Sequence, residues 1–170
     1  MGLCPDSGCR LLLTARNRRF IMMAMAARTE EEQTVHDLVI EAAVEQFAKS
    51  AKYLLHANPG TEMNVAVGRQ YPDIVVTEKG SSKVKFIIEV ETTDTVGDQE
   101  LPHWRALAGL GPPLYILTPY AATADAERLC TEAGIKCHQG YYNKDELGRF
   151  KIVLKKDSAL LSHPPPHSPR

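Results

Sequence analysis

Residues 72–92, PDIVVTEKGSSKVKFIIEVET, form the stretch that most limits the fold of this chain. Two apolar, β-branched runs flank the turn-like segment EKGSSK, a pattern that predicts an antiparallel hairpin. Because side chains alternate between the faces of a strand, the apolar faces match only when even-numbered residues lie opposite even-numbered ones. A turn centred on Ser81 meets this condition, and it places Asp73 opposite Glu89.

Three carboxylates interrupt this apolar hairpin. The Cβ atoms of Asp73 and Glu89 are predicted to lie about 5 Å apart, and Glu91 follows on the same face within about 7 Å. On a half-buried sheet these charges repel one another unless a divalent metal, a lysine or an arginine lies among them. The alternative is that Asp73 caps the start of the strand and both glutamates lie on a solvated face. Val75 and Ile87, which are apolar and share that face, favour partial burial.

The rest of the pattern predicts a mixed α/β sheet flanked by helices. A capping box at Thr29 and Glu32 predicts a helix from about 30 to about 55, which the sequence NPG then ends. The other predicted elements are strands at 63–68, 71–77, 84–92 and 114–119, helices at 103–110 and 122–134, and two final strands at 135–142 and 149–154.

The composition is that of one ordinary globular domain. The 170 residues are 44% hydrophobic and 24% charged, and the formal net charge of −1 provides no global basic field for nucleic acid. The four cysteines form no CxxC and no zinc-like spacing with histidine, which favours a reduced, cytoplasmic setting. No apolar run is long enough to span a membrane.

We expect the domain to occupy residues 29–157. Residues 1–28 are predicted to be a disordered extension, or to precede the true start codon, because Met22, Met23 and Met25 could each begin translation. Residues 158–170 are Pro-rich and poor in core-forming side chains, which predicts a disordered tail.

Pro72-Asp73, followed after fifteen residues by Glu89-Val90-Glu91, resembles the motif of the PD-(D/E)XK nuclease superfamily. The predicted element order from about 30 to about 142 is also similar to the αβββαβ core of that superfamily. The resemblance implies a restriction-endonuclease-like fold and a divalent-metal-dependent nuclease. Such a protein hydrolyses phosphodiester bonds of DNA or RNA with Mg²⁺ or Mn²⁺.

The resemblance also implies roles for single residues. Asp73 and Glu89 match the two metal-binding acids, and the backbone carbonyl of Val90 matches a further metal ligand. Glu91 stands where the motif usually has a lysine that orients the attacking water. Some restriction endonucleases with Glu-x-Glu use the second glutamate as a base or a metal-associated group, whereas other members without the lysine are inactive. Glu41 on the first helix is a further candidate metal ligand, with a solvated helix flank as the alternative.

The same resemblance implies a nucleic-acid partner, DNA rather than RNA, and a homodimer would build a larger groove for it. Arg69 and Lys85 are candidates for contact with nucleic acid, and together with His103 and Arg105 they are candidates for the missing positive charge. Trp104 is a candidate for base stacking, with a place in the core as the alternative. The alternative function is a catalytically inactive domain of this fold that binds nucleic acid or protein, with its carboxylates neutralised by Arg69 or a lysine.

Overall fold

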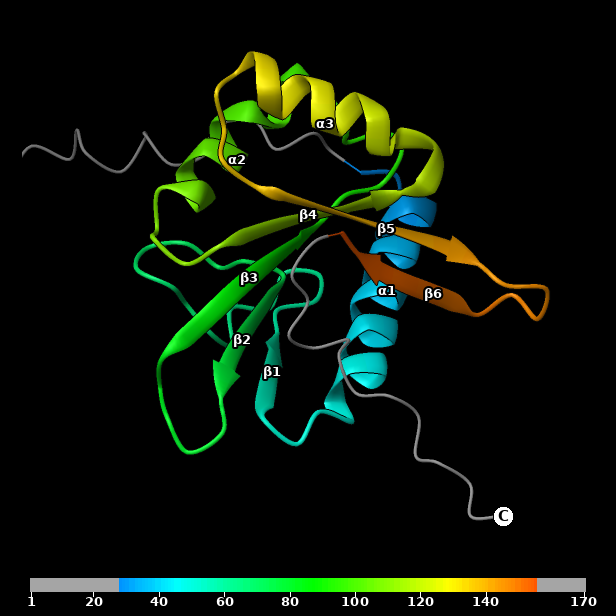
Figure 1. The fold of residues 1–170 in the computed structure, drawn as a ribbon. Coiled ribbons are helices and arrows are strands. Elements are labelled where there is room, and N and C mark those ends of the chain that lie inside the picture. The colour runs from blue at the N-terminus through cyan, green and yellow to red at the C-terminus, as the bar shows by residue number, and fades with distance from the viewer. Residues whose placement is uncertain (1–27, 156–170) are drawn as a thin grey trace, which may run out of the picture.

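The computed structural model describes residues 28–155 (Figure 1). Apart from Arg28, the predicted N-terminal extension lies outside the described residues, as does the predicted tail at 158–170. The elements are α1 (Glu30–Ala48), β1 (Tyr53–Ala57), β2 (Ile74–Glu78), β3 (Val84–Val90), η1 (Asp98–Glu100), α2 (Leu101–Ala108), β4 (Leu114–Pro119), η2 (Tyr120–Ala122), α3 (Thr123–Glu132), β5 (His138–Lys144) and β6 (Phe150–Leu154).

The strands form one mixed sheet in the order β1-β2-β3-β4-β5-β6. β1, β2 and β3 form an antiparallel meander, β3, β4 and β5 run parallel to one another, and β6 returns antiparallel to β5. The predicted mixed α/β class is therefore confirmed, while membership of the restriction-endonuclease-like fold stays a prediction. None of the helices in the described part of the chain combines the length and apolarity that a bilayer crossing requires.

Helix α1 covers one face of the sheet, and α2 and α3 cover the other (Figure 1). The core under α1 includes Val39, Ile40, Ala43, Phe47, Ile74, Val76, Ile88, Val90, Tyr115 and Leu117. The core under α2 and α3 includes Val75, Ile87, Trp104, Leu107, Leu114, Ile116, Ala126 and Leu129. Even-numbered residues of the hairpin thus face α1, and the apolar odd-numbered ones face the other two helices, as the alternation predicted.

The predicted hairpin register is confirmed over the part of the ladder nearest the carboxylates. Ile74 pairs with Ile88, and Val75 pairs with Ile87. The register shifts after Val76, so that Thr77 pairs with Val84 on the side of the turn. The irregularity therefore lies at the far end of the hairpin and leaves the alignment near Asp73 unchanged.

The predicted extent of the first helix is wrong. The Thr29 side chain does cap α1, because its Oγ1 accepts a hydrogen bond from the Glu32 backbone, but the helix ends at Ala48. The predicted end of the helix, up to about residue 55, falls instead in strand β1. Tyr53 is buried, Leu55 and Ala57 pack against the same core, and Leu54 is 44% exposed. Every second residue therefore faces the core, as in a strand, and the segment pairs with β2.

The predicted strand at 63–68 is also wrong, because this segment is a loop with one isolated bridge between Val67 and Gln70. The Asn58 side chain satisfies the loop backbone directly. Its Nδ2 donates to the carbonyls of Val65 and Pro72, and its Oδ1 accepts from the Val65 N–H. A buried side chain therefore supplies the hydrogen bonds that a neighbouring strand would have supplied.

Candidate functional site

The carboxylate cluster, defined here as Asp73, Glu89 and Glu91, lies where β2 begins and β3 ends. Asp73 is 8% exposed, Glu89 3% and Glu91 1%. The alternative in which the glutamates lie on a solvated face is therefore wrong. Because burying ionised carboxylates without partners is very unfavourable, the hydrogen bonds and charges around them decide what the cluster does.

Asp73 extends the β2–β3 ladder with its side chain. Its Oδ2 accepts a 2.8 Å hydrogen bond from the Val90 N–H, and its own backbone N–H donates to Glu89 Oε2 at 3.3 Å. Asp73 Oδ2 also lies 3.1 Å from Nε2 of His36, a buried histidine on α1. Asp73 and Glu89 are therefore linked through the Asp73 backbone, and the sequence-based prediction that they lie together is confirmed.

Glu89 is paired with a histidine from α2. Oε1 of Glu89 lies 2.8 Å from Nε2 of His103, whose side chain is 19% exposed. Burial, and then the charge of Asp73, raise the pKa of Glu89, and His103 opposes this effect. Burial alone would lower the pKa of His103, but Glu89 raises it to about 9. Near neutral pH, His103 therefore brings a positive charge to the cluster.

Hydrogen-bond donors from the loop after β3 and from α2 contact the Glu91 side chain. Its Oε1 accepts a hydrogen bond from Trp104 Nε1, and its Oε2 accepts one from Thr95 Oγ1. Burial, and then the charge of Glu89, raise the pKa of Glu91 to about 8. At the position where the motif usually has lysine, this chain therefore holds a buried carboxyl group that is mostly protonated at neutral pH.

Arg28 brings a second positive charge that the sequence analysis missed. Its Nη2 donates to the Val90 carbonyl at 3.1 Å and lies 3.6 Å from Glu91 Oε2. His36 was missed as well, although a histidine within the apolar stripe of α1 was a usable signal. Arg28 carried no such signal, because it only precedes the capping residue Thr29 in the sequence.

The structure separates the other predicted site residues from the cluster. Glu41 is exposed on α1, more than one turn beyond His36, and Arg69 is exposed in the loop before β2. The Lys85 amino group lies 3.3 Å from Glu78, toward the start of β3 and away from Glu89. None of these three contributes a hydrogen bond or an ion pair to the cluster as described in residues 28–155.

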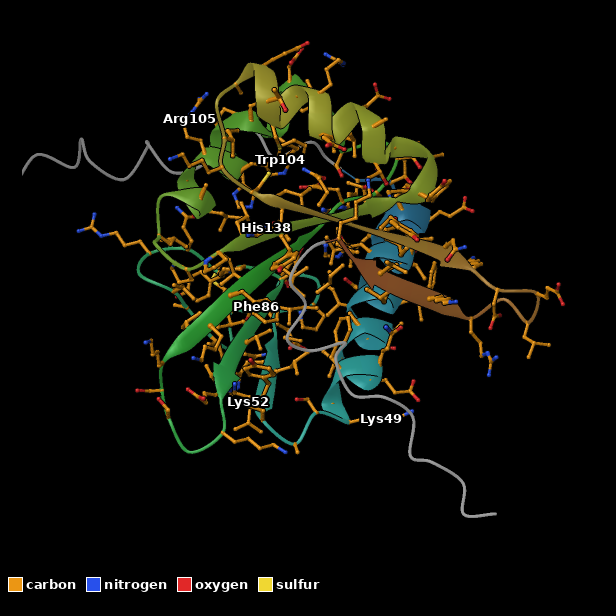
Figure 2. All side chains as sticks on the ribbon, viewed as in Figure 1. Lys49, Lys52, Phe86, Trp104, Arg105 and His138 are labelled. Carbon is orange, nitrogen blue, oxygen red and sulfur yellow. The ribbon has the colours of Figure 1, made fainter. Side chains whose placement is uncertain are left out.

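The two neighbouring α2 residues Trp104 and Arg105 point in different directions (Figure 2). Trp104 is fully buried between the helices and the sheet, which is the core position that the sequence left open. Arg105 is exposed on the outer side of α2, where its Nη2 donates to the Ala133 carbonyl at 3.0 Å. Of the four candidates for the missing positive charge, His103 alone lies against the carboxylate cluster.

The donor types of the site suit a hard divalent cation, because Mg²⁺ and Mn²⁺ prefer carboxylate and carbonyl oxygens. Asp73 and Glu89 provide two such carboxylates linked through the Asp73 backbone, and Val90, whose N–H binds Asp73, carries a carbonyl oxygen of the same class. Across residues 28–155, however, no group of three or more His, Cys, Asp or Glu side chains is arranged to hold a metal ion. The chain's own donors contact Asp73 Oδ2, both oxygens of Glu89 and the Val90 carbonyl, so a cation would have to exchange with them.

The fold and the site together define a mixed α/β domain with a buried carboxylate cluster at the end of its central hairpin. Comparison of the chain with protein-family models, with curated proteins and with solved structures gave no match.

Proposed function

We propose that this chain is a divalent-metal-dependent nuclease-like protein that hydrolyses phosphodiester bonds, of DNA rather than RNA. The observation that supports the proposal is the pair of hydrogen bonds from Val90 N–H to Asp73 and from Asp73 N–H to Glu89. Together they link both acids of the motif and the Val90 backbone at one end of the sheet. A cytoplasmic location, a nucleic-acid partner and a homodimer belong to the same proposal.

In the proposed reaction, Asp73, Glu89 and the Val90 carbonyl would hold Mg²⁺ or Mn²⁺. The bound ion would lower the pKa of a water molecule and offset the charge of the phosphodiester. His103 orients Glu89 through the 2.8 Å contact and adds positive charge near neutral pH. We assign no water-activating role to Glu91, because burial and the hydrogen bonds from Trp104 and Thr95 occupy its carboxyl group.

A catalytically inactive domain of the same fold, which binds nucleic acid or protein, is the second candidate. One observation favours it. Each member of the carboxylate cluster already lies beside an arginine, which is positively charged, or a histidine, which becomes so when protonated. Asp73 contacts His36, Glu89 contacts His103, and Glu91 lies near Arg28. These partners differ from the Arg69 or lysine that the sequence suggested for the same role.

Cleavage assays with amide variants separate the two candidates. Wild-type protein, Asp73→Asn, Glu89→Gln and the control Glu45→Gln are incubated with Mn²⁺ or Mg²⁺ and with single-stranded, duplex or branched DNA. Glu45 is exposed on α1 and remote in sequence from the cluster, so its variant controls for the loss of one acid. We expect metal-dependent cleavage by the wild type and by Glu45→Gln, and its loss in the two cluster variants.

Two other results would decide against the nuclease. Absence of metal-dependent cleavage by the wild type on all three DNA substrates would remove it. DNA binding that needs no metal and persists in Asp73→Asn would favour the inactive binding domain.

A further inference from the structure

Arg28 is inserted into the proposed metal site from the start of α1. Its side chain is only 11% exposed. Its Nη2 donates to the Val90 carbonyl at 3.1 Å, and the same atom lies 3.6 Å from Glu91 Oε2. This carbonyl is the backbone oxygen that the proposed function assigns to the metal ion.

One other nitrogen of the guanidinium group has no partner among the described residues. Within residues 28–155, Arg28 Nε is buried and makes no hydrogen bond. A buried donor without an acceptor is unfavourable, because its hydration is lost without replacement. Within residues 28–155, the guanidinium therefore contacts the Val90 carbonyl and the Glu91 carboxyl group, and its Nε lacks an acceptor.

The charge of Arg28 acts on groups from several elements. It lowers the pKa of His36 on α1 and that of Tyr142 on β5, although other causes are larger and both pKa values are raised overall. Tyr142 closes the same corner, because its hydroxyl donates to the Glu91 carbonyl at 3.0 Å. Arg28 is therefore an internal cation at the point where α1, β3 and β5 meet.

We propose that Arg28 sets the affinity of this site for divalent cations, because its guanidinium and a metal ion exclude each other at the Val90 carbonyl. The inference rests on the proposed function, since it concerns the same three ligand groups. Two cations so close together repel each other strongly in a site from which water is largely excluded. Metal binding therefore requires Arg28 to leave the carbonyl, and without metal Arg28 compensates part of the cluster's negative charge.

Binding of Mn²⁺ to the full chain tests this exchange without any measurement of activity. The free Mn²⁺ signal in electron paramagnetic resonance gives the dissociation constant for wild type, Arg28→Gln, Arg28→Lys and Asp73→Asn. Arg149→Gln is the matched control, because the Arg149 side chain is 72% exposed and pairs with Asp145 on the β5–β6 turn. Circular dichroism verifies that each variant is folded.

Arg28→Gln should bind Mn²⁺ roughly tenfold or more tightly than wild type, since a neutral amide neither repels the ion nor competes as strongly for the carbonyl. Arg28→Lys keeps the positive charge but lacks the planar guanidinium group, so the affinity of this variant for Mn²⁺ should be intermediate. Arg149→Gln should bind like wild type, and Asp73→Asn should bind much more weakly.

Several outcomes would overturn the inference. If wild type binds Mn²⁺ through Asp73 and Arg28→Gln binds equally well or less well, the inference fails while the proposed function stands. If none of the proteins binds Mn²⁺, both fail. If Arg28→Gln does not fold, the comparison moves to Arg28→Lys, and an affinity equal to that of wild type then contradicts the inference.

Discussion

The indole N–H of Trp104 donates to Oε1 of Glu91 at 2.5 Å, and both side chains are buried. Glu91 follows the last residue of β3 and Trp104 lies on α2, so this hydrogen bond ties the helix to the end of the strand. The residue at the motif's lysine position thus contributes to packing in this chain. The side chains around Glu91 therefore suit a carboxyl group, and a positive charge at position 91 would lie beside Arg28.

A lysine at position 91 should therefore destabilise the protein. Glu91→Lys would place an ammonium group beside Arg28 and leave Trp104 Nε1 without an acceptor, which should lower the free energy of unfolding by about 3–5 kcal/mol. Glu91→Gln keeps the size and a carbonyl oxygen, so it should cost about 1 kcal/mol or less. Urea denaturation at pH 5, where most of the pH-dependent loss assigned to Glu91 has not yet occurred, followed by circular dichroism, measures both. Equal stability of the two variants would contradict this account of position 91.

Asp73 is expected to stabilise the fold as well as to serve the proposed metal site. Asp73→Ala leaves the Val90 N–H without its acceptor and removes the contact of His36, which should cost about 2 kcal/mol in the free energy of unfolding. Asp73→Asn retains an oxygen at this place and should lose less than half as much. Asp125→Ala is the control, because that side chain is 68% exposed and its change should stay within about 0.5 kcal/mol. A loss for Asp73→Ala no larger than for the control would refute the structural role.

The sequence was most informative where the pattern is local. The alternation in β2 and β3 and the need to match apolar faces were enough to predict the Ile74–Ile88 register. The capping box of Thr29 likewise marked where α1 begins. The end of α1 was not predictable in this way, because Tyr53 and Leu55 fit either a helical stripe or a strand. Pairing with β2 decides between the two possibilities.

The neutralisation of the carboxylate cluster could not be predicted, because it depends on contacts distant in sequence. Arg28 lies 62 residues from Val90, and His36 lies 37 residues from Asp73. No periodicity connects such pairs, and they meet only after α1 has packed across the sheet. His103 was among several candidates for a positive charge near Glu89, but only the placement of α2 distinguishes it from Arg105.

Gly140 on β5 should not tolerate a side chain. A Cβ at this position would lie 2.9 Å from Leu154 Cδ2 and 3.1 Å from the Val153 carbonyl oxygen, which leaves no room between β4 and β6. Gly140→Ala should therefore lower the free energy of unfolding by about 1–3 kcal/mol in urea denaturation. In the control Gly97→Ala, the new Cβ would meet the flexible end of Gln99 on an extended backbone, and a change within about 0.5 kcal/mol is expected. Equal losses would mean that β5 shifts to accommodate the methyl group.

Stability should fall as the pH rises from about 5 to about 9. The folded state raises the pKa of Glu91 from its usual 4.5 to about 8, so between these values the folded chain binds a proton that the unfolded chain has released. The folded state also raises the pKa of His103 from 6.5 to about 9, and its contribution is complete below 6.5 and lost as the pH passes 9. Both groups therefore give a decrease with increasing pH, by at most about 1.4 kcal/mol per pH unit for each.

Urea denaturation at pH 5, 6, 7, 8 and 9 measures this decrease, and two variants assign it. Glu91→Gln should remove the decrease in stability that occurs below pH 8, because an amide does not titrate. His103→Gln should remove the decrease that occurs between about pH 6.5 and 9. Glu45→Gln, which alters an exposed acid on α1, should keep the wild-type profile. A wild-type stability that is constant or increases over this range would show that Glu91 is ionised in the folded protein at neutral pH. In that case the Arg28–Glu91 contact of 3.6 Å would be an ion pair with the ionised carboxylate.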